Sequence, residues 1–174
     1  MKRLFARMVL NTDRVQRGSR VLAGLALLLL LSNCAMVTND QAATAYNARG
    51  IAMVPLVDGS TRIDIATDAA FDFGSAALRP AFAAQMVTVL KPYLQHSVRV
   101  SGYTDNVGAR AFNLDLSKRR ARAVADVLRE QGFTAAQLVV SGYGEDNPVA
   151  SNATEAGRRL NRRIELLISA QVPG

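Results

Sequence analysis

Two residues of opposite charge, Asp105 and Arg120, occupy positions from which they can meet. Asp105 lies in the run 102–108, where a predicted strand passes through a loop into a predicted helix. On that helix Asn113, Ser117 and Arg120 are spaced i, i+4 and i+7, so they share one face. If this face turns toward the end of the strand, the carboxylate and the guanidinium approach one pocket.

A carboxylate beside a guanidinium has two interpretations, and spacing alone leaves both open. In the first, Asp105 caps the helix or turn and Arg120 is solvated. In the second, the two residues form a receptor for a zwitterion. Asp105 then accepts the ligand's ammonium, and Arg120 offers a planar fork of donors to its carboxylate. Such a receptor discriminates by geometry, because a ligand that lacks either group leaves a protein charge unpaired.

Signals for enzymatic chemistry are weak along the whole sequence. The single histidine, His96, has no acid or nucleophile at motif spacing, and the single cysteine excludes a Cys-clustered zinc site. The run 142–144 lacks the third glycine of a dinucleotide fingerprint, and Ser117-Lys118 lacks the Ser-x-x-Lys spacing of acyl-enzymes. We therefore expect a protein that is not an enzyme and that uses no cofactor and no metal.

The net charge of +7 belongs mostly to the first 33 residues, which hold six basic residues and one acid. Two further basic clusters, 118–122 and 158–163, contain no interleaved aromatic residues. They are read as solvated faces or extracytoplasmic contacts, and we do not expect nucleic-acid binding.

The leader resembles a secretory signal peptide over residues 1–33. Eleven uncharged residues, 21–31, follow the basic stretch, a length that suits a signal-peptide core and is too short to span a bilayer. Cys34 lies three residues after the end of this core, in Leu31-Ser32-Asn33-Cys34, which resembles a bacterial lipobox. Asn33 is an unusual neighbour for that motif, and the true start is open between Met1 and Met8. The interpretation is a lipidated Cys34 with a tether over 34–53. A chance cysteine, or an uncleaved inner-membrane anchor, is the alternative.

The elements that must position Asp105 and Arg120 are predicted from periodicity and turn residues. The expected helices and strands are a hairpin of 54–57 and 62–66, a helix from Pro80 to about Leu90, a strand at 98–103, a helix at 109–131, a strand at 138–143 and a strand at 163–169. Residues 71–75 and 145–157 are expected to be loops. The strands 98–103 and 138–143 both end in Ser-Gly-Tyr and flank the long helix, which favours a parallel β-α-β crossover. Ser-Gly-Tyr as a mere marker of strand ends is the other interpretation.

At these residues the chain resembles the OmpA-like peptidoglycan-binding domain, also found in Pal-type lipoproteins and flagellar stator proteins. The matching residues are the run 102–108, Asn113, Leu116-Ser117, Arg119-Arg120-Ala121, Val124, Gly132, Ser141-Gly142-Tyr143-Gly144 and Gly157-Arg158-Arg159-Leu160-Asn161-Arg162-Arg163-Ile164-Glu165, with Phe71-Asp72-Phe73-Gly74 similar to the family's first loop. The resemblance covers about residues 60–170.

This resemblance implies an α+β fold, a β-α-β-α-β-β two-layer sandwich with its helices packed on one mixed sheet, over a domain of residues 54–170. It also implies binding of meso-diaminopimelate in peptidoglycan stem peptides. In this family pattern Asp105 takes the ligand's ammonium and Arg120 its carboxylate. Pocket walls are assigned to Thr104, Asn113 and Leu116, backbone contacts to Phe73 and Gly74, and support from the last strand to Arg163.

The expected function is therefore that of a lipoprotein of the outer membrane, with its domain in the periplasm, that tethers the envelope to the cell wall. Ala35 after the cysteine resembles the outer-membrane pattern. The alternative is a wall-binding component of a secretion or motor assembly, anchored in the inner membrane. The sequence names no protein partner.

Overall fold

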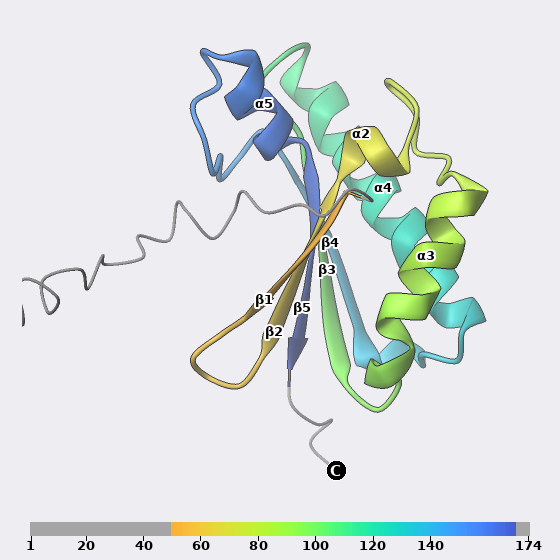
Figure 1. Cartoon of the computed structure of the whole chain (residues 1–174). Helices are drawn as coiled ribbons and strands as arrows, with labels where there is room; N and C mark the ends of the chain where they lie inside the picture. Colours follow the sequence, from red (N-terminus) through yellow and green to blue (C-terminus); the bar gives the residue numbers. More distant parts are fainter. Residues whose placement is uncertain (1–49, 170–174) are drawn as a thin grey trace, which may run out of the picture. The chain divides into compact units, whose positions relative to one another are not determined.

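The computed structural model describes residues 50–169, which form one sheet and a layer of helices (Figure 1). The elements in chain order are β1 (Ile51–Pro55), β2 (Thr61–Ala66), α2 (Thr67–Ala70), α3 (Pro80–Leu90), η2 (Lys91–Tyr93), β3 (Ser97–Tyr103), α4 (Arg110–Glu130), η3 (Ala135–Gln137), β4 (Leu138–Gly144), α5 (Glu155–Asn161) and β5 (Arg163–Ser169). Cys34, the leader and the expected tether lie outside the described residues.

The five strands form one mixed sheet in the order β1-β2-β5-β3-β4. Strands β3 and β4 run parallel and are joined by α4, whereas the other neighbours pair antiparallel. The α+β class, the mixed sheet and the crossover are therefore confirmed. Read from β2, the elements follow the expected β-α-β-α-β-β order, to which β1 and the short helices α2 and α5 are added.

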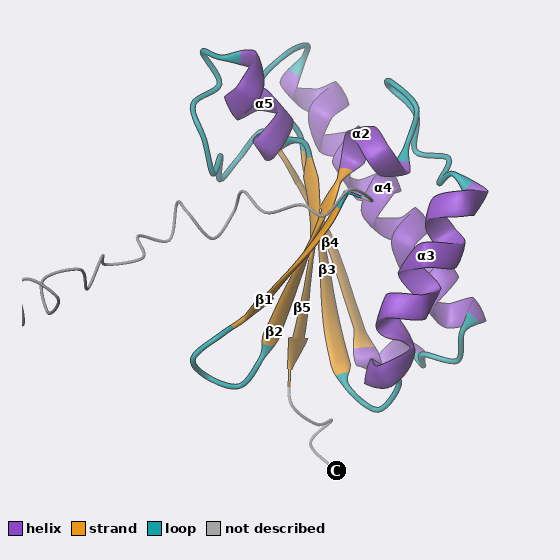
Figure 2. Ribbon diagram, viewed as in Figure 1, coloured by secondary structure: helices purple, strands orange, loops and turns teal. Residues whose placement is uncertain are grey.

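Helices α3 and α4 cover one face of the sheet, and α2 and α5 lie near one end of it (Figure 2). The core between the layers is aliphatic, with Ile65, Val100 and Leu166 on the sheet fully buried. On α4 the stripe of Ser117, Ala121, Val124 and Leu128 is fully buried against the sheet. Burial of a valine or leucine side chain such as Val124 or Leu128 stabilises the fold by about 1.5–3 kcal/mol.

The Ser-Gly-Tyr repeat has a packing reason. Gly102 and Gly142 are register partners in the parallel ladder. A Cβ on Gly102 would lie 2.3 Å from the carbonyl oxygen of Ser117, and one on Gly142 would lie 2.4 Å from the amide nitrogen of Lys118. The backbone of α4 therefore crosses the two strands where neither has a side chain, which fixes the face of α4 that turns to the strand ends.

Some element boundaries differ from the prediction. Strand β1 begins at Ile51, three residues before the expected start at Val54, because Ile51 pairs with Ile65 and packs in the core. Val57, expected in the strand, is fully exposed in the turn. Helix α5 lies partly within the expected loop 145–157, where the Thr154 hydroxyl caps it by accepting from the Gly157 amide at 3.1 Å. Within residues 50–169 no helix is long and apolar enough to cross a membrane.

Candidate functional site

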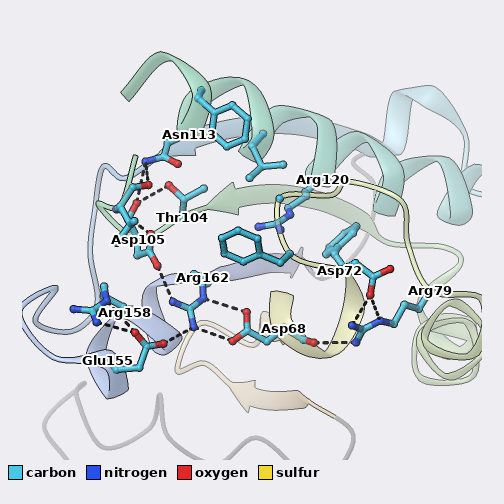
Figure 3. Close-up of a pocket in the computed structure, with 16 residues that line it drawn as sticks. Asp68, Asp72, Arg79, Thr104, Asp105, Asn113, Arg120, Glu155, Arg158 and Arg162 are labelled. Carbon is cyan, nitrogen blue, oxygen red and sulfur yellow. Dashed lines mark hydrogen bonds and ion pairs between the residues drawn. The ribbon is translucent and has the colours of Figure 1, made fainter. Parts of the chain in front are cut away.

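A pocket of about 650 Å³ lies where β3 leads into α4, beside the segment 71–79 and helix α5 (Figure 3). Its walls combine charged residues with phenylalanine and aliphatic side chains. The lining residues are Asp68, Phe71, Asp72, Phe73, Gly74, Arg79, Thr104, Asp105, Val107, Phe112, Asn113, Leu116, Arg120, Glu155, Arg158 and Arg162. Seven of the eight residues that the sequence assigned to a binding site are therefore brought together here, and Arg163 is the exception.

Arg120 reaches the pocket from the buried face of α4, and only 5% of its surface is exposed. Its Nε donates to the carbonyl oxygen of Ser75 at 2.8 Å, and its guanidinium lies 5.2 Å from the centre of the Phe71 ring. No carboxylate among residues 50–169 forms a salt bridge with it, whereas Arg79 and Arg158 each pair with one carboxylate and Arg162 pairs with three. Burial lowers the pKa of Arg120, because the charged form loses hydration.

Asp105 is held in the loop after β3 by its own neighbours. Its Oδ1 accepts from the amide of Val107 at 3.0 Å. The Asn113 side-chain amide donates to the carbonyl oxygens of Asp105 and Val107 at 3.3 and 3.1 Å, and the Thr104 hydroxyl donates to that of Asp105 at 2.9 Å. Thr104 and Asn113 thus fix the loop that carries the carboxylate, in addition to lining the pocket.

Sequence reasoning missed Arg162, the central cation of the pocket (Figure 3). Its Nη1 donates to Asp105 Oδ2 at 2.7 Å, and its Nη2 donates to Asp68 and Glu155, each at 2.9 Å. Its contacts therefore tie α2, the loop after β3 and α5 together. The hydrogen bonds to Asp68 and Asp105 raise the pKa of Arg162, and those from Arg162 and Arg158 lower the pKa of Glu155.

Arg163 points to the other side of the strand. Its guanidinium stacks at 3.9 Å over the Tyr103 ring, and its Nε donates to Glu165 at 2.7 Å. Consecutive side chains alternate at a strand, so only one of the two adjacent arginines faces the pocket. That alternation was the available signal for Arg162, but it does not say which of the two faces inward.

The formal charges of the pocket cancel, since four carboxylates (Asp68, Asp72, Asp105 and Glu155) accompany four guanidinium groups (Arg79, Arg120, Arg158 and Arg162). The pairing is uneven, however. Arg162 contacts three of the carboxylates, and Arg120 contacts none among the described residues. Among the described residues, each oxygen of Asp105 accepts one hydrogen bond and so retains acceptor capacity. A buried cation with two uncommitted Nη groups and a nearby carboxylate suits a ligand that carries both charges.

Large apolar side chains surround this charged interior. Phe73 is fully exposed, and Val107 and Phe112 are 61% and 50% exposed, although all three line the pocket. Gly74 beside Phe73 has a φ of +66°, in the left-handed region that favours glycine. The mouth therefore offers apolar contact around a polar centre, a common arrangement in sites for small ligands.

The fold and the pocket together define a small α+β binding domain. Residues 70–162 match the OmpA family, and the chain belongs to that family. It is 40% identical over 110 residues to the probable lipoprotein YiaD of Escherichia coli K12, covering 62% of this chain and 50% of that protein. It is 49% identical over 74 residues to the outer-membrane lipoprotein YfiB of Pseudomonas aeruginosa, covering 42% of this chain and 44% of that protein.

Among solved structures, the fold is similar to the cell wall anchor of the T6SS from Pseudomonas aeruginosa. The TM-score is 0.63 at 30% identity, over 71% of this chain and 90% of that one. The matched regions span between about a third and a half of the length of the first curated relatives. The similarity therefore identifies the domain, and it leaves the activity of the whole protein to be proposed.

Proposed function

We propose that this protein binds peptidoglycan without catalysis, by holding the free end of meso-diaminopimelate in the stem peptides. The observation that carries the proposal is the state of Arg120, a buried guanidinium that faces the pocket with no carboxylate partner among the described residues. A buried charge left unpaired costs several kcal/mol, so a fold that retains one favours a ligand that supplies the missing anion.

The free end of diaminopimelate carries an ammonium and a carboxylate on one carbon. In the proposal its carboxylate accepts from the Nη groups of Arg120, and its ammonium donates to Asp105, which keeps its contact with Arg162. Leu116 forms an apolar wall, and the backbone of Phe73 and Gly74 offers polar groups at the rim. Arg163 supports the site indirectly. Its guanidinium donates to the carbonyl oxygens of Asn147 and Asn161, and so holds the loop after β4 and the end of α5 against the start of β5.

The cellular setting proposed is an outer-membrane lipoprotein with its domain in the periplasm, which attaches the envelope to the wall. Its support is the leader with Cys34 and the similarity to proteins named as lipoproteins. We expect Cys34→Ser to abolish metabolic labelling with palmitate, because the thiol is the acceptor of the lipid. Labelling that persists in the variant contradicts the lipobox.

A second role has a specific observation behind it, the similarity to a structure described as a type VI secretion cell wall anchor. Under this alternative the chain is a wall-binding component of a secretion or motor assembly, held at the inner membrane. Separation of the two membranes on a density gradient decides between the roles. The lipoprotein role predicts the chain in the outer-membrane fraction, and the alternative predicts it in the inner-membrane fraction.

Sedimentation with insoluble sacculi tests wall binding itself. The full chain in detergent is expected to co-sediment, and Asp105→Ala or Arg120→Ala is expected to remain in the supernatant. Arg119→Ala is the matched control, because Arg119 neighbours Arg120 on α4 but is exposed and pairs with Asp115 at 2.7 Å. Circular dichroism verifies that all variants fold. Folded Asp105 and Arg120 variants that still co-sediment refute the assignment of the site.

A further inference from the structure

Strand β4 forms an open edge of the sheet. Among the described strands it pairs only with β3, and its seven residues, Leu138–Gly144, include no charged residue and no proline. Proteins usually protect such an edge with charges, proline or a bulge, because its outward N–H and C=O groups pair readily with another chain. β4 has its register shift on the β3 side, next to Tyr103.

A basic groove runs along this edge on the side of α4. It has a volume of about 300 Å³ and is lined by Lys118, Arg122 and the β4 residues Val140, Ser141, Gly142 and Tyr143. Lys118 and Arg122 are exposed, and neither forms a salt bridge with any residue of 50–169. They stand at i and i+4 on one helix, where like charges repel. Elsewhere on α4, Arg119 and Arg129 are each paired with an aspartate.

The opposite face of the same edge carries Val139, Ser141 and Tyr143, with the exposed Arg99 of β3 in register with Val139, and Tyr143 also borders the groove. Val139 and Tyr143 are 57% and 37% exposed, and the Tyr143 ring stacks on that of Tyr103 with centroids 5.3 Å apart. Side chains of an added strand would alternate between the two faces. Every second one would face Lys118 and Arg122, and the others would lie beside Val139 and Tyr143.

We propose that the β4 edge binds an extended acidic segment of another protein, which joins the sheet as a sixth strand. Main-chain hydrogen bonds to β4 supply affinity that does not depend on the sequence of the bound segment. Carboxylates at alternate positions of that segment supply the specificity by contacting Lys118 and Arg122. A second copy of this chain fits poorly, because pairing two β4 edges brings the same positive side chains together. The groove lies outside the pocket of Asp105 and Arg120, so this interaction leaves the wall site free.

Selection of random octapeptides on the immobilised full chain tests this proposal. We expect enrichment of peptides with Glu or Asp at every second position and apolar residues between them. With Lys118→Glu/Arg122→Glu as the target, Lys and Arg should replace the acids at the same positions. An enriched acidic peptide should also lose at least roughly tenfold in affinity for this variant, because two attractive contacts become repulsive.

Strand addition is tested on the peptide, with the protein unchanged. N-methylation of alternate amides should abolish binding in one register and spare it in the other, because only one set of N–H groups faces β4. Retained co-sedimentation with sacculi shows that the charge-reversed variant is folded. The proposal is overturned by a selection that charge reversal does not change, by indifference to N-methylation, or by dimerisation through β4 in the absence of peptide.

Discussion

Arg120 and Arg162 both lie in the pocket. We expect loss of Arg120 to weaken ligand binding with little effect on stability, and loss of Arg162 to lower the stability of the fold. Arg120→Met removes a buried cation without a carboxylate partner in the described part of the chain, together with one hydrogen bond to Ser75 and the contact with Phe71. The lost hydrogen bond and cation–π contact are worth about 2–4 kcal/mol together. Relief of the unpaired buried charge is of similar size. The free energy of unfolding should therefore change by no more than about 1 kcal/mol.

Binding should respond very differently to the same change. If Arg120 holds the ligand carboxylate, its loss costs about 2–5 kcal/mol of binding free energy. At 1.4 kcal/mol per factor of ten, affinity for sacculi or soluble muropeptides should fall from about 30-fold to several thousand-fold. Arg120→Lys should retain part of the affinity, because it keeps the charge and loses the planar fork.

Arg162→Met is the contrasting variant. It leaves Asp68, Asp105 and Glu155 without their shared cation. Removal of one partner from a buried ion pair costs about 3–5 kcal/mol, and the exposure of Asp68 and Glu155 reduces this to about 2–3 kcal/mol. Tm should then fall by about 10 °C. Binding should also weaken, because Asp105 loses the group that orients it.

Thermal unfolding followed by circular dichroism, with sedimentation on the same samples, measures both quantities. The Arg119→Met control should be neutral in each, since an exposed i, i+4 pair contributes at most about 0.5 kcal/mol. Arg120 is not a ligand-binding residue if Arg120→Met destabilises the fold as much as Arg162→Met and loses binding only in proportion to unfolding. Arg120 would then be a structural residue.

Two further predictions concern the sheet. Burial raises the pKa of Asp64, whose Oδ1 has no hydrogen-bond partner among the described residues. The ionised carboxylate therefore destabilises the fold at pH values above about 3.8, the pKa of Asp64 in the unfolded chain. Below that pH the carboxyl group is protonated in both states, and the destabilisation disappears. Asp64→Asn should therefore raise Tm at pH 7 and leave it unchanged at pH 3; an equal rise at both pH values contradicts the assignment. Gly102→Ala should lower the free energy of unfolding, measured by chemical denaturation, by about 3 kcal/mol, because the added Cβ would lie 2.3 Å from the Ser117 carbonyl oxygen. A decrease of less than about 1 kcal/mol would show that α4 moves aside easily.

The sequence predicted the parts of the fold and the site that depend on local patterns. The strand ends, the period of α4 and the face shared by Asn113 and Arg120 are short-range features, and they placed Asp105 and Arg120 at one pocket. Ile51 was missed because its strand is identified by its pairing with Ile65, a long-range contact. Short polar helices such as α5 also give little periodicity to detect.

The ion pairs of the site could not be predicted from local sequence patterns. Asp105 and Arg162 are 57 positions apart in the sequence, and no local pattern near either residue predicts their contact. The adjacent arginines 162 and 163 look alike in sequence, and only the register of β5 against β2 and β3 sends Arg162 to the pocket and Arg163 to Tyr103. The three carboxylates around Arg162 come from α2, α5 and the loop after β3, which only the folded chain brings together.

The central claim is that Arg120 and Asp105 hold the two charges at the free end of diaminopimelate. Calorimetric titration of the full chain with muropeptides that differ only in this residue, diaminopimelate or lysine, tests it most directly, because lysine keeps the amine and lacks the terminal carboxylate. We predict at least tenfold tighter binding of the diaminopimelate form, and loss of that preference in Arg120→Ala. Equal affinity for both muropeptides, or a preference that survives in Arg120→Ala, would contradict the account.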